Sequence, residues 1–171
     1  MDIKKYIAAL GFVPKNGTNG IYHKIYVDYA IEIDFEKQSV NYGDGIIAES
    51  RTTQNFSQLE NLVVLECVDR LLIKGYKPHN IVLEKTWPSG HGTSGRLDIC
   101  VNREDGTPYI LIECKTYGKE YNKESAKIHK DGGQLFTYFQ LSGGKADVVM
   151  LYASELKGNK IIYVNPLAEL I

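Results

Sequence analysis

The sequence predicts a mixed α/β fold, in which helices cover the faces of a sheet that combines antiparallel and parallel strands. A largely apolar helix is expected from about residue 57 to residue 74, and three strand-like segments follow it closely. After a second expected helix comes a continuous apolar run, residues 146–154, which is typical of a strand buried on both faces. A meander joined through a helix to a further strand gives a mixed sheet with helices on its faces.

The length and charge of the chain fit one ordinary soluble domain. It has 171 residues, of which 43% are hydrophobic and 24% charged, and a formal net charge of −1. No apolar run approaches the roughly 20 residues of a membrane span, and the start lacks the pattern of a signal peptide. A cytoplasmic protein without membrane contact is therefore expected. The three cysteines are widely spaced and match no zinc motif, so buried free thiols are expected.

The first 50 residues predict a subregion of their own, distinct from a core over residues 51–171. Residues 3–10 are expected to form a short helix that Gly11 ends. Alternating runs rich in Ile, Val and Tyr then indicate an antiparallel β-meander over residues 21–27, 30–35 and 38–42. Residues 1–50 carry seven acidic and five basic side chains, which makes a poor surface for phosphate. We expect this subregion to be a cover or docking piece.

The predicted core begins with a helix whose start and end are both marked in the sequence. Residues Ser57 to Glu60 have the capping-box pattern, and Gly75 follows the last apolar residues. Apolar side chains on two sides indicate a helix that lies covered on a sheet. Three strands are expected next, at 80–87, 96–102 and 108–115, with an Asp-Gly hairpin signal before the third. A polar, lysine-bearing loop, a helix at 133–141, strands at 146–154 and 159–163, and a terminal helix turn at 167–171 complete the order.

Two carboxylates and one lysine stand out within these apolar strands. Residues i and i+2 of a strand point to the same face, so Glu113 and Lys115 project together. Asp98, on the neighbouring strand of the same predicted hairpin, can reach the same patch. Half-buried charges are costly unless they are paired or bound to metal. A structural ion pair would explain one such carboxylate, but two on adjacent strand ends also suit a hard cation such as Mg²⁺.

The spacing from Asp98 to Glu113 and Lys115, on strands in this order, resembles the PD-(D/E)XK nuclease superfamily. The superfamily core is a helix, a three-strand meander, a helix and a strand. The resemblance therefore implies a restriction-endonuclease-like core, preceded here by the N-terminal β-meander. Leu97 stands where the superfamily name has proline.

A narrower resemblance rests on longer stretches of sequence. The segments ENLVVLECVDRLLIKGYKP, LEKTW, GRLDI, LIECKT and DGGQLFTYF look like the N-terminal nuclease domain of type I restriction enzyme R subunits and of related restriction-methylase fusions. The likeness covers about residues 56–155. Gln134 and Tyr138 are four apart on one helix and so share a face. They are similar to the Q-x3-Y motif of the RecB-like branch.

The resemblance implies a role for each of these residues. Asp98 and Glu113 would be ligands of Mg²⁺ or Mn²⁺, and Lys115 would lie at the attacking water. Gln134 and Tyr138 would face the metal site rather than the core, where they position the scissile strand or support the lysine. The family also uses a glutamate on the first helix. We favour Glu66, because Glu60 already has an explanation as the third residue of the capping box.

The polar segment after the third core strand adds a possible contact to nucleic acid. Lys119, Lys123 and Lys127 are four apart and would form one face if the segment were helical, with Glu120 and Glu124 as intrahelical partners. The three lysines form either a solvated face or a track for DNA backbone phosphates. In the second case, salt would screen the binding. The glycine-rich loop at 87–95 could also follow DNA, or it could be only a hairpin loop.

Together these observations predict a Mg²⁺-dependent deoxyribonuclease domain of a type I-like restriction-modification system, which cleaves unmodified foreign double-stranded DNA. Motor, methylase and specificity domains or subunits would be its partners. The alternative is a non-catalytic module, in which a nuclease fold serves DNA binding or docking within a restriction assembly. Because the net charge is near zero and only one lysine run stands out, weak DNA binding without sequence preference is expected.

Overall fold

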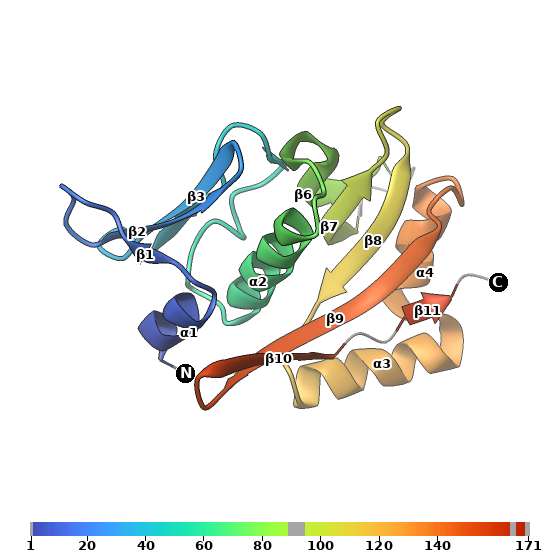
Figure 1. The fold of residues 1–171 in the computed structure, drawn as a ribbon. Helices are drawn as coiled ribbons and strands as arrows, with labels where there is room; N and C mark the ends of the chain where they lie inside the picture. Colours follow the sequence, from blue (N-terminus) through green and yellow to red (C-terminus); the bar gives the residue numbers. More distant parts are fainter. Residues whose placement is uncertain (1, 89–94, 165–166, 170–171) are drawn as a thin grey trace.

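The computed structural model describes residues 2–88, 95–164 and 167–169, which form two sheets and four α-helices (Figure 1). The smaller sheet has the strand order β1-β2-β3-β4, and the larger has the order β10-β9-β8-β7-β6-β5, with β11 also paired to β9. Helix α2 lies between the smaller sheet and one face of the larger sheet, while α3 and α4 cover the opposite face (Figure 1). The predicted mixed α/β architecture is confirmed at this level.

The N-terminal subregion is the predicted helix and antiparallel meander. The side chain of Asp2 caps the helix by accepting a hydrogen bond from the backbone N–H of Lys5. Each strand of the smaller sheet pairs antiparallel with the next. Its alternating Ile and Val side chains point towards α2 and join the core there. The elements are α1 (Ile3–Ala9), β1 (Val13–Pro14), β2 (Ile21–Tyr26), β3 (Tyr29–Asp34) and β4 (Ser39–Asn41).

The larger sheet is built on an antiparallel meander, β6 to β8, to which β9 is added parallel to β8. This is the mixed pairing that the order of predicted elements required. A short strand, β5, pairs parallel with β6 at the edge. The strands are β5 (Ile47–Ala48), β6 (Ile81–Thr86), β7 (Arg96–Asn102), β8 (Pro108–Cys114), β9 (Val148–Lys157), β10 (Lys160–Val164) and β11 (Leu167–Glu169).

The end of the chain corrects one prediction. Residues 167–171 were expected to form a helix turn, but residues 167–169 form strand β11. Strand β10 pairs only with the second half of β9, from Ala153 to Lys157. The first half of β9 would otherwise present unpaired backbone groups at that edge, and β11 bonds to it from Val148 to Met150.

Helix α2 (Glu60–Ile73) confirms the predicted core helix but not its cap. The helix begins at Glu60, Leu59 at its N-cap makes no side-chain bond, and Ser57 instead bonds to Asn55. A short 3-10 helix, Pro78–Asn80, then leads into β6. No helix among the described residues is long and apolar enough to cross a membrane.

The segment expected to be a polar loop contains a helix, α3 (Lys119–Asp131), which precedes α4 (Gly133–Leu141). Its inward side chains are Tyr121, Glu124 and, partly, Ile128, at the spacing of one helical face. That narrow stripe packs on the sheet although the rest of the helix is polar, so tertiary contact outweighs the polar composition. Gly132 separates the two helices with a left-handed backbone, φ 84°.

The core consists of two clusters, one on each face of the larger sheet. The cluster on the α2 face includes Ile99 and Ile112 and extends into the smaller sheet. The cluster on the α3 and α4 face includes Leu111, Leu135 and Tyr138. The three cysteines are buried and free, as expected: Cys67, Cys100 and Cys114.

Candidate active site

The two predicted ligands and the lysine meet where β7 and β8 run side by side. Asp98 lies on β7, and its Oδ2 accepts a hydrogen bond of 2.7 Å from the backbone N–H of Cys114. Glu113 and Lys115 flank Cys114, and Lys115 Nζ donates to Glu113 Oε1 at 2.8 Å. Ile112 and Cys114 point instead into the core on the α2 face. The structure therefore brings Asp98, Glu113 and Lys115 together, as the period-2 pattern predicts.

Burial controls the charges of this cluster. Loss of water raises the pKa of Asp98, and the neighbouring charge of Glu113 raises it further. Burial also raises the pKa of Glu113, although Lys115 opposes that shift. For Lys115, burial lowers the pKa, but the charges of Glu113 and Asp98 outweigh it and the net shift is upward. Lys115 is therefore a charged ammonium group in this arrangement.

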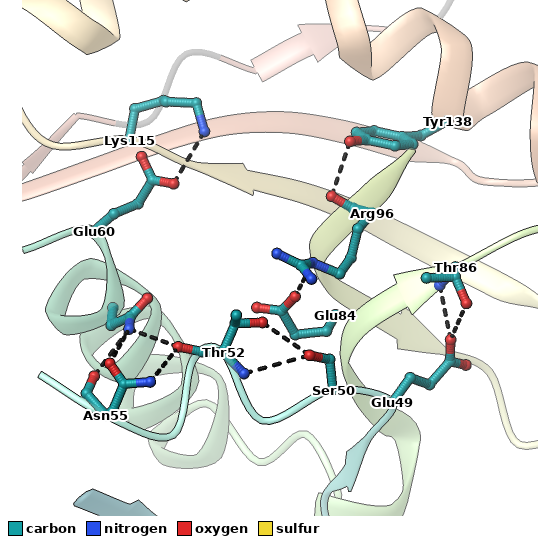
Figure 2. Close-up of polar contacts among 11 residues, drawn as sticks. Glu49, Ser50, Thr52, Asn55, Glu60, Glu84, Thr86, Arg96, Lys115 and Tyr138 are labelled. Carbon is teal, nitrogen blue, oxygen red and sulfur yellow. Dashed lines mark hydrogen bonds and ion pairs between the residues drawn. The ribbon is translucent and has the colours of Figure 1, made fainter. Parts of the chain in front are cut away.

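Helix α2, the first helix of the core, brings Glu60 and not Glu66 to this cluster. Glu60 is the first residue of α2, and its Oε1 lies 3.3 Å from Lys115 Nζ (Figure 2). Six residues along a helix amount to about one and two-thirds turns, so the Glu66 side chain projects from a different side of α2 than the Glu60 side chain does. Glu66 is buried, its Oε1 accepts a bond of 2.7 Å from Arg70, and its Oε2 accepts one from the Tyr152 hydroxyl. The sequence favoured Glu66 as the helix glutamate of the site, but in the structure Glu60 is the one that lies beside Lys115.

Gln134 and Tyr138 differ in burial: Tyr138 packs in the core, which corrects the expectation for that residue, whereas the role of Gln134 at the site stays a prediction. Tyr138 is 2% exposed and belongs to the core cluster, whereas Gln134 is exposed. The buried side of α4 runs through Leu135 and Tyr138, which are three residues apart. The Tyr138 hydroxyl still reaches the edge of the site, because it donates a bond of 2.9 Å to the carbonyl of Arg96, two residues before Asp98 (Figure 2).

The carboxylates fit a small, hard cation. Glu113 is 4% exposed, and its Oε2 is buried without a hydrogen-bond partner among the described residues. Such an orphaned carboxylate oxygen is costly unless something binds it. Within residues 2–88, 95–164 and 167–169, no group of three or more His, Cys, Asp or Glu side chains could hold a metal ion. Two carboxylates suffice for Mg²⁺, which keeps several waters and also binds substrate phosphate.

The predicted lysine track lies on α3. Lys119, Lys123 and Lys127 are exposed, and Lys127 pairs with Glu124 at 2.8 Å. Glu124, expected to be an ordinary intrahelical partner, is instead 4% exposed and has one buried oxygen without a partner among the described residues. Its charge adds to the upward pKa shift of Glu113. The sequence signal for it is its place three residues after Tyr121, on the apolar stripe of the helix.

Two further residues beside the site were not anticipated from the sequence. Glu84 on β6 is buried, and its carboxylate pairs with the guanidinium of Arg96 on β7 (Figure 2). The predicted DNA-contacting loop at 87–95 falls largely on residues 89–94, outside the described residues.

A comparison with known families covers the candidate site residues from Glu60 to Tyr138. Residues 60–149, more than half of the chain, match the family model described as type I restriction enzyme R protein N terminus (HSDR_N). The matched range begins at Glu60 and includes Asp98, Glu113, Lys115 and Tyr138. No curated protein matches the chain.

Proposed function

The chain belongs to the family of type I restriction enzyme R protein N termini, and we propose that it is the metal-dependent deoxyribonuclease domain of a type I-like restriction-modification system. The family indicates a restriction-modification role and points to a nuclease. The observation that carries the finer proposal is the convergence of Asp98, Glu113 and Lys115 around a buried, unpartnered carboxylate oxygen. Metal-assisted phosphodiester hydrolysis can use this combination of a cation site and a positive side chain.

Asp98 and Glu113 would hold Mg²⁺ or Mn²⁺, and a bound cation would supply Lewis-acid stabilisation and an activated water. The ammonium group of Lys115, fixed at 2.8 Å from Glu113, offsets the negative charge that develops on the phosphate. Glu60 steadies the lysine from the start of α2. The proposed set of site residues therefore contains Glu60 in place of Glu66.

The proposed substrate is double-stranded DNA that lacks the protecting modification. Exposed Lys119 and Lys123 on α3 would contact backbone phosphates without reading sequence. Motor, methylase and specificity components would be the partners, because the matched family is that of type I restriction enzyme R proteins. A cytoplasmic location goes with this proposal.

Cleavage of supercoiled plasmid by the purified chain tests the proposal. We expect nicking in Mg²⁺ or Mn²⁺, none in EDTA, and none for Asp98→Asn in either metal. Asp105→Asn is the matched control, because Asp105 is exposed in the β7–β8 turn. Plasmid binding without metal-dependent nicking would contradict the nuclease proposal and favour the DNA-docking module.

A further inference from the structure

The pair formed by Glu84 and Arg96 combines a buried acid with a half-exposed base. Only 3% of the Glu84 side chain is exposed, against 47% of the Arg96 side chain. The contact joins a carboxylate oxygen of Glu84 to Nε of Arg96. Among the described residues, the two terminal guanidinium nitrogens of Arg96 donate no hydrogen bond, and Glu84 Oε2, although in ion-pair contact with Nε, has no hydrogen-bond partner.

The backbone at Glu84 is unusual for a strand. Its φ is 57°, in the left-handed region that residues other than glycine rarely adopt. Leu83 pairs with Ile99 and Lys85 pairs with Leu97, so Glu84 lies opposite Asp98 without regular pairing. Backbone strain of this kind persists only where the surrounding structure imposes it, and it is common at functional sites. Here it turns a buried carboxylate towards Arg96.

Arg96 is also fixed through its main chain. Its carbonyl accepts the bond from the Tyr138 hydroxyl at 2.9 Å. The preceding residue, Gly95, packs so closely under the Tyr138 ring that a Cβ there would stand 2.5 Å from Cε1. Arg96 is therefore held by Glu84 at its side chain and by Tyr138 at its main chain (Figure 2). It lies two residues before Asp98 on the same strand.

We propose that Arg96 is a phosphate-binding residue, which contacts the nucleic-acid backbone beside Asp98, and that Glu84 is the positioning residue that aims it. This inference rests on the proposed function. A guanidinium whose Nε is occupied still presents paired N–H groups that match two phosphate oxygens. The neighbouring side chains Asp98, Glu113 and Glu60 are acidic and would repel a backbone phosphate, so a fixed positive charge at this edge offsets them.

A competing explanation is that Arg96 only neutralises a buried carboxylate. A double substitution separates the two roles, because it removes both charges and leaves no buried charge without a partner. Glu84→Gln/Arg96→Gln should melt close to the parent protein if the pair is the main electrostatic interaction of both residues. Any loss of DNA binding by that variant then reports on Arg96 itself.

The experiment measures binding of a fluorescent DNA duplex by anisotropy at several salt concentrations, in EDTA so that no metal-dependent cleavage occurs. We expect the double variant to bind about tenfold more weakly, as for the loss of one charged hydrogen-bonded contact. The slope of log K against log salt should fall by about 0.9. Lys37→Gln is the control for loss of one positive charge, because Lys37 is 80% exposed and lies in the turn between β3 and β4 of the smaller sheet.

Affinity and salt slope equal to those of the parent would overturn the role of Arg96. If the double variant does not fold, Arg96→Lys decides: it keeps a charge beside Glu84 but lacks the paired donors. Several-fold weaker binding of that variant supports the proposal, and unchanged binding overturns it. Failure of the parent protein to bind any duplex would overturn the proposed function as well, which distinguishes the two failures.

Discussion

Helix α2 takes part in two charged clusters that differ in how completely their polar atoms are bonded. The first joins Glu66 to Arg70 and Tyr152, and Arg70 also donates to the Tyr152 hydroxyl at 2.8 Å. Arg70 further lies over the ring of Tyr163, 3.4 Å from its centroid. Every carboxylate oxygen of Glu66 has a partner within the protein. We call this set of four residues the closed cluster.

The second cluster, which we call the open cluster, joins Glu60 to Lys115, Glu113 and Asp98. It holds three carboxylates and one lysine; one buried oxygen of Glu113 has no partner among the described residues, and Asp98 is half-buried. In the closed cluster, both carboxylate oxygens of Glu66 are bonded within the protein, so they stabilise the fold and are not free to bind a ligand. The comparison indicates that burial of a charge alone does not identify a functional site, and that an unsatisfied buried acceptor within a group of several carboxylates and a lysine makes the open cluster the stronger candidate.

The largest expected effect is the loss of DNA cleavage when the lysine of the open cluster is replaced. Lys115→Met should lower metal-dependent plasmid cleavage by about 10²–10³-fold, as for loss of one group that stabilises transition-state charge. Initial rates at fixed Mg²⁺ measure it, and Lys37→Met is the control, because the Lys37 side chain is 80% exposed and lies outside the site and the lysine track. Cleavage by Lys115→Met at the parent rate would remove the lysine from the mechanism.

The next effect compares the two glutamates of α2. Glu66→Gln should cost about 2 kcal/mol, because it breaks a largely buried pair with Arg70 whose partner is partly exposed. For a chain of this length that lowers the melting temperature by about 4–8 °C. Glu60→Gln, on the same helix, should change the melting temperature little, because the Glu60 side chain is 30% exposed.

Cleavage should show the opposite ranking when both variants are assayed well below their melting temperatures. Glu60→Gln should cleave more slowly than the parent, and Glu66→Gln at close to the parent rate. Thermal melts and plasmid assays on the same preparations provide both measurements. If Glu66→Gln were inactive while fully folded and Glu60→Gln were not, the closed cluster would be the functional one.

The smallest effect concerns two buried tyrosine hydroxyls. Tyr138→Phe removes one bond to the Arg96 carbonyl and should cost about 1 kcal/mol, or about 2–4 °C in melting temperature. Tyr152→Phe removes bonds to both Glu66 and Arg70 and should cost more. The ranking is read from thermal melts of the two variants. A larger loss for Tyr138→Phe would mean that the edge of the open cluster, not the closed cluster, is the main polar anchor of the core.

Local patterns were sufficient to predict the strands and the central convergence of the site. Strand alternation puts Glu113 and Lys115 on one face, and the Asp-Gly hairpin puts Asp98 on the neighbouring strand. Both are properties of a few adjacent residues, and the structure has them. The resemblance to restriction enzyme R subunits rests on the same segments, and the family match over residues 60–149 supports it.

Long-range packing decided what the sequence left open or predicted differently. The choice between Glu60 and Glu66 depends on which side of α2 meets Lys115 and which meets Tyr152, residues more than fifty positions away. Helix α3 forms in a polar segment because the sheet offers a surface for a narrow stripe of side chains. Tyr138 is buried for the same reason, since its neighbour Leu135 lies on the same inward side of α4.

The sequence by itself therefore determined the main helix and strands of the core, their order, and the convergence of Asp98, Glu113 and Lys115. The tertiary structure alone decided which helix glutamate joins them and that Arg96 is held between Glu84 and Tyr138. The physical reason is range: alternation and turn chemistry act between neighbours in the chain. The direction of a helix face, or a left-handed glutamate inside a strand, is set by contacts between segments that the chain brings together only on folding.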